Sequence, residues 1–307
     1  MTRFLVTGAS GLLGLNLALK LAETHNVTGV IHQPELTGTP FEVLVTDLSL
    51  PGEAEWVLEH SLPEVIIHTA AMAIVDDCEK DPTRALSVNA DLPGRLARMT
   101  GEMGARFIHI STDAVFDGKK GGYREEDIPN PLSTYARTKL AGEIAVMAEN
   151  PESLIARVNF YGWSLRGTRS LAEFFFNNLS AGKAVNGFRD VMFCPLLVND
   201  LVELLIKMNE KGLTGLYHTV SSEKTSKYEF GLALAKKFGF DPGLINSVSV
   251  NEAGLVAARS LNLDLVTAKL TKDLGSPTPG IQSGLDTFFN LNQSGYAERL
   301  HGFLEAG

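Results

Sequence analysis

The sequence predicts an α/β protein with a doubly wound parallel sheet and a smaller C-terminal lobe. Through residues 1–160, short and almost wholly apolar runs alternate with segments of helical periodicity. Strands of that kind are buried on both faces of a parallel sheet, and right-handed crossovers place helices on either side of it. Residues 161–307 alternate less regularly. We therefore expect a sheet domain over 1–160 and, over 161–307, mainly a lobe that covers it.

The expected strands of the first half are apolar runs bounded by polar or turn-forming residues. In chain order they are residues 4–7, 27–32, 42–45, 64–68, 106–111 and 154–158. Helices are expected between them at residues 11–23, 53–60, 82–99 and 132–149. The first of these helices carries Leu12, Leu15 and Leu19 at helical spacing, which gives it an apolar face to place against the sheet.

The second half contains three expected helices and one expected strand. The helices are residues 170–179, 198–210 and 226–238, and the strand is residues 216–220. Ser226 can cap the N-terminus of the last helix. Phe174, Phe175 and Phe176 stand in a row in the first helix, which indicates a packing surface in the core or at an interface rather than a ligand site. Segments between about 190 and 225 are expected to return to the sheet.

Composition argues against several functions. The chain has 307 residues, of which 44% are hydrophobic and 21% charged, as in ordinary folded proteins. A net charge of −9 argues against nonspecific binding to nucleic acid or anionic membranes. Cys78 and Cys194 stand far apart, which is neither a disulfide framework nor a metal-ligand spacing, so we expect two buried thiols and no metal. With no signal-peptide pattern and no apolar run of membrane-spanning length, a cytoplasmic location is expected.

A glycine-rich turn follows the first expected strand and opens the first expected helix. Glycines at this spacing in a Rossmann βαβ unit permit the tight turn, the approach of the backbone to phosphate and close helix–sheet packing. The phosphate then lies at the helix N-terminus, where free N–H groups and the helix dipole favour an anion. The alternative is a turn without a ligand. We expect a dinucleotide site whose contacts include Gly8, Ser10, Gly11, Leu12, Leu13 and Gly14.

The end of the second expected strand bears on the choice of cofactor. Folds that bind NAD usually carry an Asp or Glu there, and such a carboxylate would repel the 2′-phosphate of NADP. Residues 29–33 hold no carboxylate and no Arg, so NADP is the expected cofactor, with NAD possible. His32 either donates to that phosphate or is a surface histidine. Further expected cofactor contacts follow the third and fourth strands at Asp47, Leu48, Ala70 and Ala71.

Tyr135 and Lys139 lie one helical turn apart and share a helix face. A tyrosine with its ordinary pKa of about 10 shuttles protons poorly at neutral pH, and a nearby ammonium lowers that pKa. Both residues are also expected to touch the cofactor. Thr112 follows the strand 106–111 and can hydrogen-bond a substrate oxygen, but Ser111 is a rival because alternation points the two hydroxyls to opposite faces. These residues predict nicotinamide-dependent reduction of a carbonyl or oxidation of an alcohol.

These motifs resemble the extended short-chain dehydrogenases/reductases, and most closely the dTDP-4-dehydrorhamnose reductase family. The segments that carry the resemblance are 63–71, 88–90, 110–118, 123–127, 135–143, 217–218 and 226–230. The resemblance covers most of the chain and is dense over its first 160 residues. It implies a Rossmann domain with a substrate-binding lobe, the catalytic set Thr112, Tyr135 and Lys139, and Asn89 near the cofactor.

The resemblance also implies NADPH-dependent reduction of a 4-keto sugar nucleotide, as in dTDP-rhamnose biosynthesis. Two segments that line the sugar-nucleotide pocket in the family, residues 157–162 and 188–195, differ here, so the sugar and the base stay open. Asp113 and Asn159 are expected substrate contacts. Arg189 is the expected partner of the substrate's diphosphate, because an Arg fork can pair two phosphate oxygens at once.

Two alternatives stay open. The regulatory β subunit of methionine adenosyltransferase resembles the same family, so the chain could be a dinucleotide-binding partner subunit without catalysis. A sugar-nucleotide epimerase would favour tightly held NAD. In either case the expected ligands are small molecules, with no nucleic acid and no membrane, and a homodimer is possible.

Overall fold

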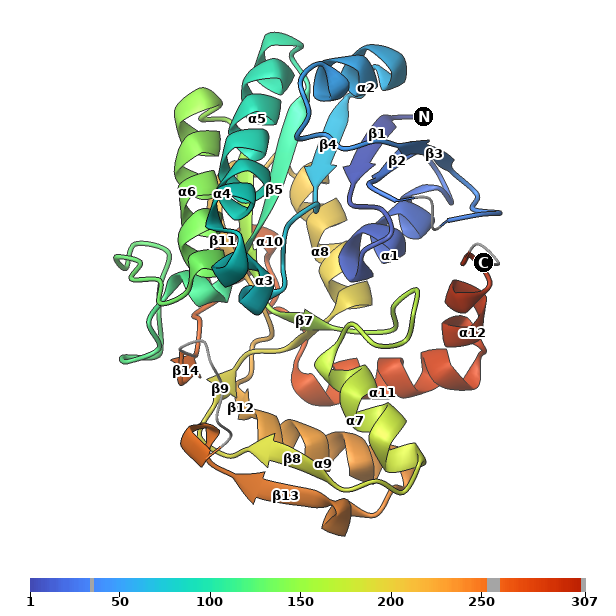
Figure 1. The fold of residues 1–307 in the computed structure, drawn as a ribbon, viewed down its shortest axis with the longest axis vertical. Helices are drawn as coiled ribbons and strands as arrows, with labels where there is room; N and C mark the ends of the chain where they lie inside the picture. Colours follow the sequence, from blue (N-terminus) through green and yellow to red (C-terminus); the bar gives the residue numbers. More distant parts are fainter. Residues whose placement is uncertain (34–35, 253–259, 305–307) are drawn as a thin grey trace.

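The computed structural model describes residues 1–33, 36–252 and 260–304. Its centre is a seven-stranded sheet in the order β11-β6-β5-β4-β1-β2-β3, and every neighbouring pair is parallel. The strands are β1 (Arg3–Thr7), β2 (Asn26–Ile31), β3 (Glu42–Val45), β4 (Val65–His68), β5 (Arg106–Thr112), β6 (Leu154–Val158) and β11 (Gly215–Thr219). Figure 1 shows helices around this sheet, which confirms the doubly wound α/β prediction.

The helices that alternate with the strands of the first half follow the predicted order. They are α1 (Leu12–Leu21), α2 (Glu53–Ser61), α3 (Val75–Lys80), α4 (Pro82–Leu86), α5 (Leu92–Glu102) and α6 (Thr134–Glu149). Helix α3 was not predicted. Helix α6 begins at Thr134 because the Ser133 hydroxyl accepts from the Ala136 N–H and caps it.

The predicted helix over 82–99 is confirmed, with one irregularity. A π-helical turn at Ser87–Asp91 lies between α4 and α5, and the chain stays helical through it. Pro93 follows this turn in the first turn of α5; it has no N–H, and its ring would clash with the carbonyl of Asn89 in a regular α-helix. The widened turn relieves that clash. It also carries the Asn89 carbonyl toward α6, where a Cβ on Gly142 would lie 2.2 Å from the Asn89 oxygen.

The second half contributes three kinds of structure. Strand β11 and helix α8 (Val198–Glu210) extend the sheet layers, with β7 (Phe160–Tyr161), β10 (Leu196–Leu197) and α10 (Ala268–Leu274) beside them. Below the sheet in Figure 1 lies the lobe. It contains α7 (Leu171–Ser180), β8 (Val185–Phe188), β9 (Met192–Phe193), β12 (Thr225–Ser226), α9 (Lys227–Phe238), β13 (Ile245–Val248), β14 (Asn262–Leu263), α11 (Ile281–Gln293) and α12 (Tyr296–His301).

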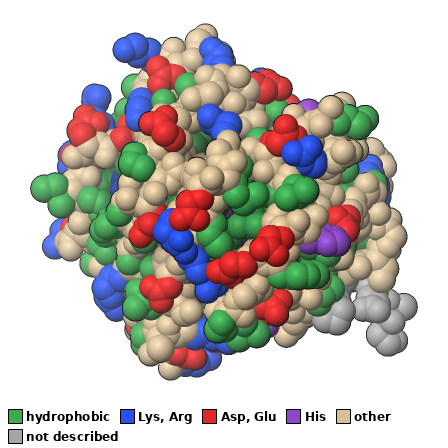
Figure 2. All heavy atoms as spheres, turned by 90° about the horizontal axis from the view of Figure 1, so that it is seen from above, with side chains coloured by type: hydrophobic (Ala, Val, Ile, Leu, Met, Phe, Trp, Pro, Cys, Tyr) green, Lys and Arg blue, Asp and Glu red, His purple; other side chains and the backbone are tan. Residues whose placement is uncertain are grey.

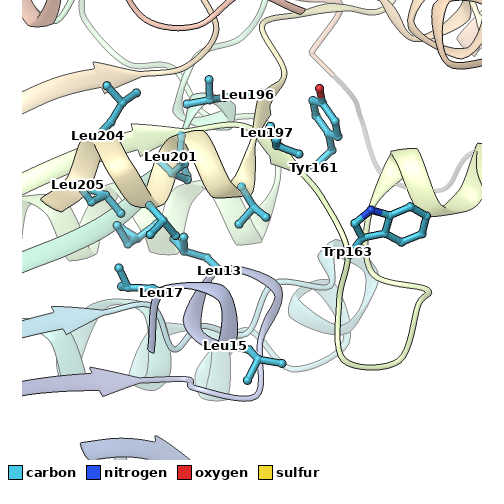
Figure 3. Close-up of a cluster of buried hydrophobic side chains, with 14 of the residues drawn as sticks. Leu13, Leu15, Leu17, Tyr161, Trp163, Leu196, Leu197, Leu201, Leu204 and Leu205 are labelled. Atoms are coloured by element: carbon cyan, nitrogen blue, oxygen red, sulfur yellow. The ribbon is translucent and has the colours of Figure 1, made fainter. Parts of the chain in front are cut away.

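One hydrophobic core runs through both halves of the chain. Leu13 and Leu17 of α1 pack with Leu201 of α8 in a single buried cluster, as Figure 3 shows. Tyr161 and Trp163, from the segment after β6, belong to the same cluster. The Trp163 ring stacks on Phe288 of α11 at 4.1 Å, and its Nε1 donates to the Phe288 carbonyl. The lobe is therefore continuous with the sheet domain in its packing.

The aromatic run of α7 serves mainly as packing. Phe175 is fully buried and Phe176 meets Trp163 edge to face at 4.9 Å, while Phe174 is 44% exposed. On the face above the sheet, Figure 2 shows basic and acidic side chains interspersed with hydrophobic ones. Among the described residues, no helix combines the length and the apolar character needed to cross a membrane.

Candidate active site

Two cavities lie at the carboxyl ends of the sheet strands. The larger, about 770 Å³, is lined by residues after β1, β2 and β4, and the smaller, about 230 Å³, by residues after β5 and β6. They are neighbours: Ile74, Ile110 and Phe160 line the first, while Val75 and Thr112 line the second. In open α/β sheets ligands bind at these strand ends, so the two cavities together form the candidate site.

The glycine-rich turn forms the floor of the larger cavity. Gly8 has a φ of +70°, and a Cβ there would lie 2.8 Å from the Ala70 Cα. A Cβ on Gly14 would lie only 2.1 Å from the Gly8 carbonyl oxygen. Helix α1 begins after Gly11, which supplies no side-chain cap, so its N-terminal N–H groups face a possible anion. This cradle fits a dinucleotide diphosphate.

Most of the predicted cofactor residues are brought together in the larger cavity. Its lining includes Gly8, Ser10, Gly11, Leu12, Leu13, Gly14, His32, Leu48, Ala70 and Ala71. Asp47 does not line it. The Asp47 carboxylate accepts from the backbone and hydroxyl of Ser49, and burial alone would raise its pKa, but these bonds and nearby cations hold it below its ordinary value.

At the end of β2 the structure adds a cation that the sequence analysis missed. Arg84 of α4 places Nη2 3.4 Å from Asp47 Oδ2, and His32 Nδ1 lies 3.7 Å from the same oxygen. His32 is 56% exposed. No local pattern in the sequence indicates this arrangement. Arg84 is distant in sequence from His32, and the two side chains approach the same carboxylate only in the folded protein.

Asn89 lies behind the cofactor cavity rather than in it. Its Oδ1 accepts from the Met72 N–H, and its Nδ2 donates to the Met72 carbonyl at 3.1 Å and to Thr138 Oγ1 at 3.0 Å. The side chain is 1% exposed. Asn89 therefore links the segment after β4 to helix α6. It does not line the cavity itself, but it helps to hold in place the segment whose residues do.

The structure separates the two rival hydroxyls of β5. Ser111 donates to Glu143 Oε1 at 2.5 Å, and Glu143 in turn accepts from Nε and Nη2 of the buried Arg157. Thr112 points to the other face and lines the smaller cavity together with Tyr135. Strand alternation left open which of the two hydroxyls faces the cavity, and in the structure it is Thr112.

Tyr135 and Lys139 share a face of α6, but their electrostatics differ from the expectation. Burial raises the pKa of Tyr135 to about 12, although a hydrogen bond with Thr112 acts in the opposite direction. Burial also lowers the pKa of Lys139 to about 8. The Lys139 ammonium donates to the Ile110 carbonyl at 2.7 Å. The expected lowering of the tyrosine pKa is absent, because desolvation outweighs the hydrogen bond with Thr112 and the Lys139 ammonium is directed to the Ile110 carbonyl.

Asp113 and Asn159 form a pair at the wall of the smaller cavity. Asn159 Nδ2 donates to Asp113 Oδ2 at 2.6 Å, and Thr112 Oγ1 donates to Asp113 Oδ1 at 3.1 Å. Burial raises the pKa of Asp113 to about 6. Lys227, the first residue of α9, lines the same cavity and opposes that shift electrostatically. The sequence analysis did not select Lys227, because only the fold brings α9 over the end of β5.

The structure does not bring Arg189 to this cavity. Its Nη1 donates to the Ser247 carbonyl at 3.2 Å, and Nη2 lies 3.6 Å from Glu252 Oε1. The Arg189 N–H donates to the Val248 carbonyl, which continues the pairing of β8 with β13 by one residue. Among the described residues, the cation that lines the smaller cavity is Lys227.

The fold and the two cavities define a class of protein: a doubly wound dinucleotide-binding protein with a Thr-Tyr-Lys group beside a second, smaller pocket. The chain belongs to the RmlD substrate binding domain family, whose model matches residues 2–293. The chain is 33% identical to the probable low-salt glycan biosynthesis reductase of Haloferax volcanii over 91% of this chain and 95% of that one.

Two further relatives carry different descriptions. The methionine adenosyltransferase 2 subunit beta of Bos taurus is 32% identical over 93% of this chain and 88% of its own. A dTDP-4-dehydrorhamnose reductase of Mycobacterium tuberculosis is 34% identical over 84% of this chain and 83% of its own. The solved dTDP-4-dehydrorhamnose reductase of Bacillus anthracis, in complex with NADP, superposes with a TM-score of 0.84 at 26% identity, covering 94% of this chain and 99% of that one. The family predicted from the motifs is thereby confirmed.

Proposed function

We propose that this protein uses NADPH to reduce a 4-keto sugar nucleotide. The observation that carries the proposal is the position of Thr112 and Tyr135, which line the smaller cavity where it adjoins the dinucleotide-sized one. A hydroxyl and a phenol there can reach one oxygen of a substrate while the cofactor lies alongside. NADP in the Bacillus anthracis relative supports the choice of cofactor, and NAD is the alternative.

When bound, the nicotinamide would supply the hydride that the carbonyl carbon receives. Tyr135 gives the proton that the resulting oxyanion needs, since a phenol with a pKa of about 12 is fully protonated at neutral pH. Thr112 holds the same oxygen by a hydrogen bond. Lys139, with a pKa of about 8, is mostly charged at pH 7. It shares a face of α6 with Tyr135, and we assign to its ammonium the stabilisation of the phenolate that remains after proton transfer.

The smaller cavity suits a sugar ring. Asp113, Asn159 and Lys227 offer it a carboxyl group, an amide and an ammonium, which are the groups that bind sugar hydroxyls and a neighbouring phosphate. Asp113 and Asn159 are already hydrogen-bonded to each other, so their positions are defined before a substrate arrives. We therefore retain Asp113 and Asn159 as substrate contacts and assign the diphosphate to Lys227 rather than to Arg189.

The decisive experiment follows NADPH absorbance with a panel of 4-keto sugar nucleotides that vary in sugar and base. We expect substrate-dependent oxidation of NADPH by the wild-type protein and almost none by Tyr135→Phe. Parallel titrations of NADPH and NADH measure the cofactor preference. Saturable NADPH binding without turnover on any member of the panel would contradict the reductase proposal.

A partner-subunit role is the second candidate. The identity to the methionine adenosyltransferase 2 subunit beta, 32%, is level with the 33% and 34% identities to the two reductases. Sedimentation of the protein with a methionine adenosyltransferase catalytic subunit tests this role directly. A stable complex, together with no turnover in the reductase panel, would favour it.

A further inference from the structure

We propose that Arg166 and Arg169 form a clamp on the diphosphate of the bound dinucleotide, opposite the glycine-rich turn. The inference rests on the proposed cofactor site and adds two contacts from the lobe segment that precedes α7. Both arginines line the larger cavity together with Gly11 and Leu12. The cofactor would then be held from two sides, by the backbone of α1 and by guanidinium groups that can each pair two phosphate oxygens.

The first argument is charge. The ionisable side chains that line the larger cavity are His32, Arg166 and Arg169, and none of the described lining residues is acidic. The chain as a whole has a net charge of −9. The sign of the local charge is therefore opposite to that of the protein, as expected for a cavity that attracts an anionic ligand.

The second argument is the support beneath the two arginines. Glu173 is 0% exposed, yet its carboxylate accepts from the backbone N–H groups of Ser164, Arg169 and Ser170 and from the Ser164 hydroxyl. Burying a carboxylate is unfavourable unless its oxygens are hydrogen-bonded. Here those bonds hold the segment in one conformation, and Asn177 Nδ2 adds a bond to the Gly167 carbonyl. The arginines thus project from a rigid base, which lowers the entropy lost on binding.

The third argument identifies the group that is clamped. Asn16 of α1 donates to the carbonyls of both Leu12 and Trp163, so the segment that bears the arginines is tied to the first turn of α1. A dinucleotide places its diphosphate at that helix N-terminus. The 2′-phosphate of NADP belongs instead at the end of β2, beside His32. We therefore assign the arginines to the diphosphate, which NADPH and NADH share.

The test is calorimetric titration of NADPH and NADH into the wild-type protein and into Arg166→Ala, Arg169→Ala and the double variant. Lys183→Ala is the matched control, because Lys183 is an exposed cation of the same lobe that lines neither cavity. We expect each single variant to raise both dissociation constants by the same factor of about three to ten, and the double variant by about ten- to a hundredfold. Added salt should weaken wild-type binding more than binding by the double variant.

Three other outcomes would contradict the proposal, each at a different point. Unchanged binding by the double variant would remove both arginines from the site, while the proposed cofactor site would stand on the wild-type titration. A loss for NADPH alone would move the arginines to the 2′-phosphate. A wild-type protein that binds neither dinucleotide would overturn the cofactor site itself and the clamp with it. Equal melting temperatures of the variants without ligand would show that folding is unchanged.

Discussion

At the scale of single residues, the site depends on which face of β5 each side chain occupies. Ser111 and Thr112 are adjacent and chemically similar, but the Ser111 hydroxyl is hydrogen-bonded to Glu143 of the buried Glu143–Arg157 pair. That pair is 7% and 3% exposed at its two side chains, and a buried ion pair needs further hydrogen bonds to offset its desolvation. Ser111 supplies one of them, which leaves Thr112 for the cavity.

Tyr135→Phe is expected to lower turnover by at least about a hundredfold, the usual scale for a lost general acid. The phenyl ring fills the same space, so the NADPH dissociation constant should change little. Steady-state kinetics beside NADPH titration on the same preparation measures both. Turnover at the wild-type rate would show that another group supplies the proton.

Asp113→Asn is expected to change how stability depends on pH. Burial raises the pKa of Asp113 from 3.8 to about 6, so the folded protein holds this proton more tightly than the unfolded chain does. The resulting stabilisation is present below pH 4 and is lost as the pH rises through about 6. Because Asn stays neutral, the variant should gain about 3 kcal/mol relative to wild type between pH 4 and pH 7, at about 1.4 kcal/mol per pKa unit.

Urea unfolding of both proteins at a series of pH values measures this difference. Most other titrating groups cancel in the comparison, and the Asn side chain can still accept from Asn159. Parallel stability curves for the two proteins would show that Asp113 titrates near its ordinary pKa.

Lys227→Ala is expected to raise the KM for the sugar nucleotide by about tenfold, the scale of one charge-assisted hydrogen bond. Lys227 lines the smaller cavity, whereas Arg189 is held by Ser247 and Glu252. Arg189→Ala is therefore the matched variant and should leave the KM unchanged. The opposite pattern in Michaelis kinetics would restore the role first predicted for Arg189.

At the scale of elements, the π-helical turn before α5 positions Asn89, which supports one wall of the larger cavity. It turns Asn89 so that one side chain joins the segment after β4 to α6. Met72 and Thr138 are thus linked across two layers. The turn is local in sequence, but its consequence depends on α6 presenting Gly142 to the Asn89 carbonyl.

Asn89→Ala is expected to destabilise the protein by about 2–3 kcal/mol, because it removes the three hydrogen bonds that the buried Asn89 amide makes with Met72 and Thr138. It should also weaken NADPH binding, since Ala70 and Ala71 adjoin Met72 and line the cavity. Chemical unfolding and NADPH titration measure the two effects. Thr138→Val removes one of the three Asn89 bonds, together with the bond from the Thr138 hydroxyl to the Tyr135 carbonyl, but leaves both bonds to Met72 in place. It is the graded control and should weaken NADPH binding less than Asn89→Ala does.

At the scale of the whole molecule, the larger cavity is lined by both halves of the chain, from Gly8 to Ile74 and from Phe160 to Arg169. The core that contains Trp163 and Phe288 is shared in the same way. A ligand in this cavity should therefore stabilise the sheet and the lobe together. The proposed boundary near residue 160 then separates two regions of different role, but the two regions are expected to unfold together.

The two tryptophans report on the two halves, Trp56 in α2 and Trp163 beside the lobe. Within each of the variants Trp56→Phe and Trp163→Phe, we expect the fluorescence of the remaining tryptophan and the far-UV circular dichroism to follow one coincident urea transition. NADPH at 100 times its dissociation constant should stabilise each variant by about 2.7 kcal/mol. Different midpoints for the two probes within one variant, or stabilisation by NADPH in only one variant, would mean that the halves unfold independently.

The local pattern of the sequence determined most of the sheet and most of the residues that line the larger cavity. Apolar runs set the strands, and the glycine turn placed Gly8 to Gly14 at the larger cavity, because strand–turn–helix chemistry depends on neighbours in the chain. The sequence analysis also brought together Thr112, Asp113, Tyr135 and Asn159, largely through family motifs.

Only the tertiary structure decided which cations lie beside each cavity. Lys227 lines the smaller cavity, and Arg166 and Arg169 line the larger one, because α9 and the segment that Glu173 anchors lie beside strand ends that are distant in sequence. It also decided between Ser111 and Thr112, and it raised rather than lowered the pKa of Tyr135. The pKa of a side chain and its ability to bind a charged ligand depend on how far it is buried and on which charged groups lie near it. Both depend on contacts between residues distant in sequence, which exist only in the folded protein.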